Sequence, residues 1–122
     1  MEQVLGRVTF RQRDVVIIPV PFSDQKSVKV RPAIVVSNDK VNSRTEDLVL
    51  VPLTSVLGGS EFALRIDEAS LERGRLLALS DARVDKIFTA QKVLVKRRVG
   101  TVRQEVLHAI GRKLSRLIAV AS

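Results

Sequence analysis

The 122-residue sequence predicts a single, mostly β domain with a helix at its C-terminal end. Short apolar runs of strand-like composition are separated by polar or glycine-containing turns, and the connections between them are too short to hold crossover helices. The apolar period then changes from strand-like to helical near residue 102. Together these observations favour a compact antiparallel sheet or a small barrel, followed by one amphipathic helix.

The first half of the chain contains three predicted strands. Residues 1–10 have little pattern and are expected to form a short arm, and the first strand follows over 13–22, with two prolines that place its end at an edge or bend. Residues 23–30 are polar and suit a mobile hairpin loop. The runs at 34–37 and 48–53 are almost continuously apolar, so we expect strands covered on both faces, joined by a polar connection over 38–46.

The second half contains shorter strands. Residues 61–66 alternate between polar and apolar, which predicts a half-buried strand, and residues 76–79 predict another after Gly74. Residues 92–96 fit either a short strand or a helical turn.

The last segment predicts an amphipathic helix. Thr101 followed by Gln104 fits a capping box at its start, and Gly111 inside it costs about 1 kcal/mol relative to alanine unless close contacts require it. The apolar side chains fall on one stripe, made of Val102, Val106, Ile110, Leu114, Leu117 and Ile118.

Composition narrows the possible functions. No apolar run approaches the length that spans a bilayer, and the first residues lack the hydrophobic stretch of a signal peptide, so we expect a cytoplasmic protein. The absence of cysteine and the single histidine exclude disulfides, thiolate nucleophiles and histidine-rich metal sites. With four Phe and no Tyr or Trp, any affinity for nucleic acid must depend mainly on charge.

The net charge of +8 lies entirely in the second part of the chain. Residues 1–74 carry ten basic and ten acidic side chains, whereas residues 75–122 carry eleven basic and three acidic ones. The densest stretch, residues 92–103, has five basic side chains and no acid. Such a field favours a polyanion or an acidic protein partner, although it also fits a basic face that only aids solubility.

Two polar side chains stand at the ends of apolar strands. Arg31 precedes Pro32, which biases it toward an extended conformation at the mouth of the following strand. Thr54 ends the run that begins at Asp47 and precedes a loop with two adjacent glycines. A permanently charged guanidinium and a hydroxyl at strand ends are a plausible pair for handling a phosphate group.

In order and spacing, these pieces resemble the MazF/PemK family of toxin endoribonucleases. The likeness covers residues 11–118 and rests on the ordered set as a whole. Its pieces are Arg13-Asp14-Val15-Val16, Pro21-Phe22, Arg31-Pro32-Ala33, Asp47 to Ser55, Gly74 to Phe88, and Gly100 onward.

The resemblance implies a small SH3-like barrel of the MazF/CcdB type, a homodimer, and cleavage of single-stranded RNA, chiefly messenger RNA, without metal. It assigns Arg31 and Thr54 as the catalytic pair, and an acidic antitoxin as the inhibitor. The RNA contacts that we expect are Lys29, Ser55, Arg83 and Lys86. In such a reaction the 2′-hydroxyl of the RNA is the nucleophile and one product ends in a 2′,3′-cyclic phosphate.

Each of these residues also has a structural interpretation. Arg31 could bridge to Asp24, and Thr54 could be an ordinary β-branched strand residue. The acids Asp81 and Asp85 are expected to form a salt-bridged surface. His108 lies in the predicted helix far from the pair, so we favour a structural role, and we expect Phe88 to fill the core rather than stack on a base.

Two other functions remain open on sequence alone. One is a gyrase-poisoning toxin related to CcdB, which shares the barrel and acts by binding protein. The other is a catalytically silent member that only binds RNA or an antitoxin. The chain also departs from the family pattern, because residues 24–30 lack glycine and Lys86-Ile87-Phe88-Thr89 stands where members have Ile-Arg-Thr.

Overall fold

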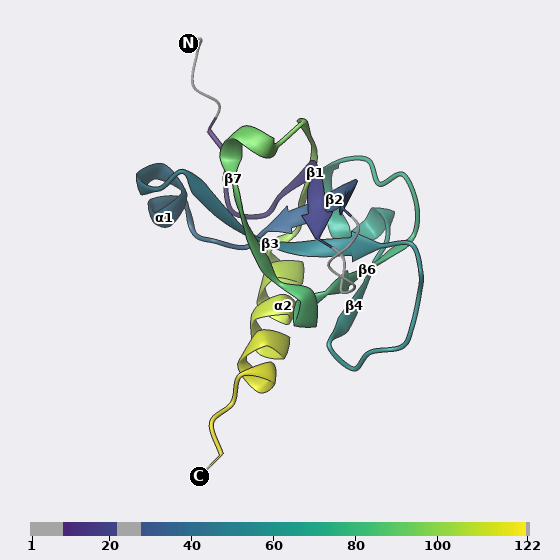
Figure 1. Ribbon diagram of the computed structural model, residues 1–122. Helices are drawn as coiled ribbons and strands as arrows, with labels where there is room; N and C mark the ends of the chain where they lie inside the picture. The colour runs from purple at the N-terminus through teal and green to yellow at the C-terminus, as the bar shows by residue number, and fades with distance from the viewer. Residues whose placement is uncertain (1–8, 22–27, 122) are drawn as a thin grey trace.

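The computed structural model describes residues 9–21 and 28–121, which form an antiparallel sheet with a helix packed against it (Figure 1). Short 3₁₀ helices are labelled η. In chain order the elements are β1 (Asp14–Pro21), β2 (Val28–Val35), α1 (Asp39–Arg44), β3 (Asp47–Thr54), β4 (Ala63–Ile66), η1 (Glu68–Ser70), β5 (Leu71–Gly74), β6 (Ser80–Arg83), η2 (Val84–Lys86), β7 (Phe88–Gln91), η3 (Lys92–Leu94), β8 (Arg97–Val102) and α2 (Gln104–Leu117).

The strands lie in the order β4-β6-β3-β2-β1-β8-β5, and β7 pairs with the first part of β3. The mostly β fold with a C-terminal helix is therefore confirmed, but the sheet is not closed, because the described residues show no pairing between β4 and β5 at its two ends. These end strands are consecutive in the chain and are joined only by residues 67–70. Since four residues span little more than about 15 Å, the sheet must curl strongly to bring its edges together.

The connection between β4 and β5 is a capped turn. Asp67 and Ser70 form a capping box around η1, each side chain accepting a hydrogen bond from the other's backbone N–H. After this turn β5 pairs with β8.

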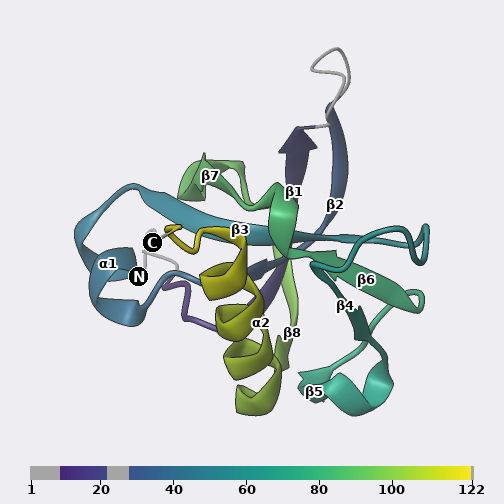
Figure 2. The same cartoon turned by 90° about the horizontal axis from the view of Figure 1, so that it is seen from below.

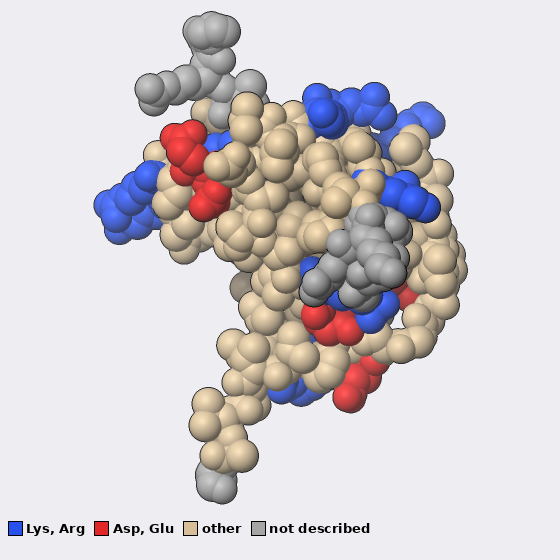
Figure 3. Space-filling model, in the orientation of Figure 1, with Lys and Arg blue, Asp and Glu red and all other residues tan. Residues whose placement is uncertain are grey.

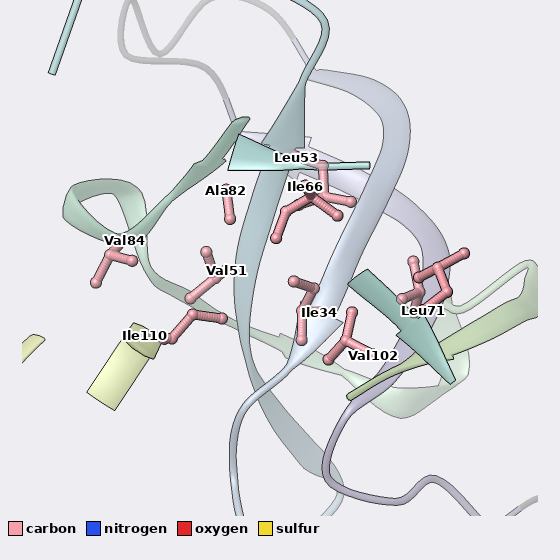
Figure 4. Packing of buried hydrophobic residues seen from close by; sticks show 10 residues of the cluster. Ile34, Val51, Leu53, Ile66, Leu71, Ala82, Val84, Val102 and Ile110 are labelled. Carbon is pink, nitrogen blue, oxygen red and sulfur yellow. The ribbon is translucent and has the colours of Figure 1, made fainter. Parts of the chain in front are cut away.

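Strands β2 and β3 are covered on both faces, as their continuous apolar composition predicts. One hydrophobic cluster includes Ile34, Val51 and Leu53, and a second includes Ala33 and Val35 together with residues of β1 and β3. Figure 4 shows the first cluster, which gathers side chains from both strands, from the neighbouring strands and from α2. Phe88 packs against the second cluster, in agreement with its predicted core role.

Helix α2 covers the first cluster and lies beside β8 in Figure 2. Ile110 is buried, and Val106 and Leu114 pack around it, as the apolar stripe predicts. The stripe does not extend as far as predicted, because Val102 belongs to β8 and Ile118 is exposed. No helix in the described parts of the chain combines the length and apolar character needed to cross a membrane.

The predicted capping box at Thr101 and Gln104 is wrong. Thr101 belongs to β8, and the residue that caps α2 is Arg103, whose side chain makes no capping hydrogen bond. Arg103 is held instead by contacts with the η1 turn, where its backbone N–H donates to the carbonyl of Ser70. The entry into the helix is thus fixed by tertiary contacts.

The strand predicted at 76–79 is also wrong. Those residues form an irregular loop, in which Leu77 is 82% exposed. The strand that pairs with β3 and β4 is the next segment, β6, whose Ser80 and Asp81 are buried. The apolar pattern did not predict this strand, because two of its four residues are buried polar groups.

Four other predicted segments are described in more detail by the structure. The polar connection at 38–46 contains α1, which begins because the Asn38 side chain accepts a hydrogen bond from the Val41 N–H. The open choice at 92–96 is resolved as the 3₁₀ helix η3. Of the loop predicted at 23–30, residues 28–30 belong to β2 and residues 23–27 lie outside the described residues. At the end of the predicted arm, Phe10 is buried in the second cluster.

Candidate active site

Arg31 and Thr54 lie where β2 and β3 separate. The pairing of these strands runs as far as Ala33 opposite Pro52, and two residues further along each strand are Arg31 and Thr54. Because side chains alternate across a strand, a step of two residues keeps both on one face and at one level. Beyond this point β2 remains paired with β1, whereas β3 pairs with β6.

A pocket of ≈ 370 Å³ lies at this divergence and brings together four of the six predicted site residues, namely Arg31, Thr54, Arg83 and Lys86. The rest of its lining is mostly apolar and consists of Val20, Pro21, Pro52, Leu53, Val56 and Gly58. Three cations around a hydroxyl suit a phosphate group of a polyanion.

Arg31 is exposed, and the hydrogen bond that the structure gives its side chain goes to the carbonyl of Val30. Within the described ranges it has no ion-pair partner. Asp24, the alternative partner considered above, lies outside those ranges. Since Arg31 lines the pocket and is exposed, its remaining donors can reach a ligand bound there.

Thr54 is half-buried, and its Oγ1 accepts a hydrogen bond of 3.1 Å from the backbone N–H of Val56. This contact folds the chain back after the strand and fixes the position of the hydroxyl oxygen. The hydroxyl proton remains available as a donor toward the pocket.

Asp81 anchors the loop that follows Thr54. Its side chain is almost fully buried and accepts a hydrogen bond of 2.7 Å from the Gly58 N–H and another of 2.7 Å from Arg65 Nε. Burial by itself raises the pKa of Asp81, but the hydrogen bonds from Arg65 and Gly58 and the nearby guanidinium charges outweigh it, so the pKa is lowered. The prediction of a surface acid is wrong here: the ion pair exists, but the carboxylate lies inside and supports the pocket wall.

Arg83 is oriented by Asp85. The guanidinium donates from Nε and Nη2 to the two carboxylate oxygens at 2.9 and 2.8 Å. The hydrogen bond from Arg83 is the main reason that the pKa of Asp85 is lowered, and the same bond raises the pKa of Arg83. The predicted salt bridge is therefore present, and it does not use Nη1 of Arg83, a residue that lines the pocket.

The two other predicted RNA contacts lie apart from this pocket. Ser55 lines a neighbouring pocket on the other side of Arg31. Lys29 stands two residues before Arg31 on the same face of β2, opposite Val20, but lines neither pocket. His108 is exposed on α2 and also lies outside both pockets, so the structure does not bring it near the pair.

The basic stretch 92–103 does not act as one surface. Lys92 donates to the carbonyl of Asn42, Arg98 pairs with the buried Asp14 at 2.9 Å, and Arg103 donates to the carbonyl of Ala69. Lys96 and Arg97 have no side-chain partner among the described residues. In Figure 3, basic side chains form several separate groups on this face, with the larger one at the upper right edge.

The described residues contain no group of three or more His, Asp or Glu side chains placed to hold a metal ion. The positive charge around the pocket comes from side chains, which supply fixed hydrogen-bond donors.

The model of the PemK-like, MazF-like toxins of type II toxin-antitoxin systems matches residues 11–118. The chain belongs to the MazF/PemK toxin family. The match covers both strand ends that form the pocket, so the resemblance found in the sequence is confirmed. No curated protein matches the chain.

Solved structures of MazF toxins share the fold. The Mycobacterium tuberculosis toxin MazF-mt6 superposes with a TM-score of 0.72 at 16% identity, covering 90% of this chain and 100% of that chain. An endoribonuclease from Mycobacterial species gives a TM-score of 0.74 at 17% identity, with coverage of 94% and 96%. The MazE-MazF complex from Deinococcus radiodurans gives 0.72 at 17% identity, with coverage of 94% and 100%. At such identities the likeness shows the MazF-type fold.

Sequence reasoning predicted Arg31 and Thr54 as a pair, and the structure places both in one pocket, but it missed two parts of their surroundings. One is the anchoring role of Asp81. The feature that indicates this role is an acidic residue inside a short strand, directly opposite Thr54. The other is Arg97, which lies with Ser55 in the neighbouring pocket and was seen only as part of a charge cluster.

Proposed function

We propose that this toxin is an endoribonuclease that cuts single-stranded RNA, chiefly messenger RNA, at specific sequences and thereby inhibits translation. The observation that carries the proposal is the placement of Arg31 and Thr54 at one level of two diverging strands, in one pocket with Arg83 and Lys86. A pocket that joins three cations and a hydroxyl suits the scissile phosphate and not an apolar or neutral ligand.

In the reaction, the 2′-hydroxyl of the RNA loses its proton to water and its oxygen attacks the adjacent phosphorus. The bond from phosphorus to the 5′-oxygen breaks, and that oxygen takes up a proton from water. The products carry a 2′,3′-cyclic phosphate and a 5′-hydroxyl. Arg31 stabilises the negative charge that grows on the nonbridging oxygens, because its donors are fixed, charged and open to the pocket. Thr54 donates a hydrogen bond from its hydroxyl to a nonbridging phosphate oxygen or positions the 2′-hydroxyl. No step requires a metal ion.

The relatives support the partners in this proposal. One structural neighbour is an endoribonuclease in complex with its cognate antitoxin, and others are MazE-MazF complexes. We infer that this chain works as a homodimer, and that an acidic antitoxin blocks it by covering the pocket and the cations around it.

The test is to incubate the purified protein with a mixed-sequence, unstructured RNA in EDTA and to map the ends of the products. Wild type is expected to cut at a short sequence and to leave cyclic phosphate ends. Arg31→Ala should lower the rate by at least about a hundredfold, the cost of losing one charge-stabilising group. Arg112→Ala is the matched control, since Arg112 is exposed on α2 and lines neither pocket. Equal cutting by Arg31→Ala and wild type would reject the proposal, and absence of cutting by wild type would favour a binding-only member.

A further inference from the structure

A second pocket adjoins the catalytic one. It has a volume of ≈ 300 Å³ and shares Arg31 and Leu53 with the first pocket. Thr54 lines the first pocket and the next residue, Ser55, lines the second, as expected for neighbouring residues that point to opposite sides. Arg31 therefore stands at the border between two hollows at the same end of the sheet.

Arg97 places a second cation in this pocket. Ile17 pairs with Arg97 across β8 and with Pro32 across β2, so the three residues form a row on one face of the sheet. Arg31 belongs to the adjacent row, opposite Ile18. Among the described residues Arg97 has no hydrogen-bond or ion-pair partner, unlike Arg98 beside it, which is held by Asp14. The guanidinium of Arg97 is therefore available to form an ion pair with a bound anion.

Much of the rest of the pocket lining is apolar. Leu76, Leu77 and Ala78 contribute to it from the loop between β5 and β6. Leu77 is 82% exposed, although large aliphatic side chains are most often buried in a folded domain. An apolar lining combined with two guanidinium groups matches a nucleotide, which has a flat base and a charged phosphate.

We propose that this second pocket, lined by Arg97, Ser55 and Leu77, binds the nucleotide next to the cleavage site in the RNA substrate. Arg97 pairs with the phosphate on that side, and Leu76 and Leu77 contact the base. The inference rests on the proposed function, since it assigns Arg31 to the scissile phosphate between the two pockets. It adds a binding residue and a binding subsite for RNA. Through them, the part of the RNA beyond the cut bond contributes to affinity.

The charge of the pocket lining and its continuity with the catalytic pocket favour RNA, and not an apolar protein segment, as the occupant. Two arginines line the pocket, and no acid does. It also shares Arg31 and Leu53 with the catalytic pocket, so adjacent nucleotides of one strand can occupy the two hollows on either side of Arg31.

The test compares Arg97→Ala, Leu77→Ser and the matched control Arg112→Ala. The probe is a fluorescent oligoribonucleotide that contains the mapped cleavage sequence, with one 2′-deoxy nucleotide at the cut position to keep it intact. If wild type cuts nothing, the mixed-sequence RNA itself serves as the intact probe. Affinity is measured by anisotropy at several salt concentrations, thermal melting checks the fold, and light scattering gives the oligomeric state.

Arg97→Ala is expected to weaken binding about tenfold or more, the effect of losing a charge-assisted hydrogen bond. It should also reduce the slope of log affinity against log salt by about 0.7, the contribution of one phosphate contact on a single strand. Leu77→Ser should weaken binding with little change in that slope, because it removes no charge. Arg112→Ala should behave nearly as wild type.

The inference is overturned if Arg97→Ala and Arg112→Ala bind RNA equally well. It is also overturned if changes at Arg97 or Leu77 alter the oligomeric state and leave RNA affinity intact, since the pocket would then be a contact between copies of the chain. A wild type that binds RNA through Arg97 but does not cut it would reject the proposed function and keep the subsite. A wild type that does not bind RNA would reject both.

Discussion

The arginines of this toxin differ in role because their surroundings differ. Arg31 has no acid beside it within the described residues, whereas Arg83 is held by Asp85 and Arg65 by Asp81. A guanidinium fixed by a carboxylate loses part of its net charge but gains a defined direction. The site thus combines an unpaired arginine at the strand end with an oriented one across the pocket.

The carboxylate of Asp81 should make the free energy of unfolding depend on pH. Its folded-state pKa, like that of Asp85, is lower than in the unfolded chain, so the unfolded state binds more protons in acid. The resulting stabilisation is complete above about pH 4 and is lost as pH falls through the folded-state pKa. Asp81→Asn should therefore lower the free energy of unfolding at pH 7 by about 2 kcal/mol, the cost of a lost charge-assisted hydrogen bond, and should lower it by less at pH 2.5.

Urea unfolding at pH 7 and at pH 2.5 measures both values. Asp67→Asn is a useful control, because Asp67 is an exposed acid whose capping contacts lie at η1, away from the pocket. A loss for Asp81→Asn that is the same at both pH values would contradict the role of the charge.

At the residue scale, the sequence predicted the groups at the ends of apolar strands and missed those inside polar ones. Arg31 and Thr54 could be found because each follows or precedes a clear apolar run. Asp81 could not, because its role depends on the Gly58 N–H, which lies 23 residues away in the chain. Contacts of that kind leave no local pattern.

At the scale of elements, apolar periodicity located β1, β2, β3 and α2 but failed for short polar strands. Strand β6 has only four residues, and two of them are buried polar groups. The four apolar residues before it form a loop, and we propose that this loop serves substrate binding. Local composition and local structure disagree there because tertiary pairing with β3 and β4 decides which segment is the strand.

Two glycines in these elements should respond oppositely to alanine. Gly74 has φ +87°, and a Cβ there would collide with the Val99 carbonyl, so Gly74→Ala should destabilise the fold by about 1–3 kcal/mol. Gly111 lies within α2, and a Cβ there meets nothing within 4 Å. Gly111→Ala should therefore stabilise the helix by about 1 kcal/mol.

Chemical denaturation of both variants checks this pair, with cleavage activity expected to survive in Gly111→Ala. Destabilisation by Gly111→Ala would show that the open side of α2 is covered in solution, for instance by a second copy of the chain. A neutral Gly74→Ala would show that β5 and β8 can move apart without cost.

At the scale of the whole molecule, the sheet curls without closing, and β3 makes this possible. The strand pairs with β2 over its middle and with β6 at its end. The change of partner creates the divergence in which the pocket lies, so the feature that bends the sheet also forms the site. The sequence predicted β2 and β3 but neither β6 nor this exchange of partners, which depends on register.

Charge at this scale predicts a strong salt dependence of RNA binding. Some basic side chains, such as Arg98 and Lys92, make contacts within the fold. Other cations line the two pockets. The logarithm of the affinity should fall linearly with the logarithm of salt concentration, by about 0.7 for each phosphate contact. Anisotropy titrations from low to physiological salt measure the slope, and a flat response would contradict a charge-led interface.

The most direct test of the central claim, that the pocket at Arg31 and Thr54 cuts RNA through its own 2′-hydroxyl, is a single-atom change in the substrate. An RNA with one mapped cleavage site and a second RNA with a 2′-deoxy nucleotide at that site are incubated with the toxin, and the products are resolved at single-nucleotide length. We expect cutting of the first and none of the second at that position, with binding of both. Cutting of the deoxy substrate at the same bond would contradict the account.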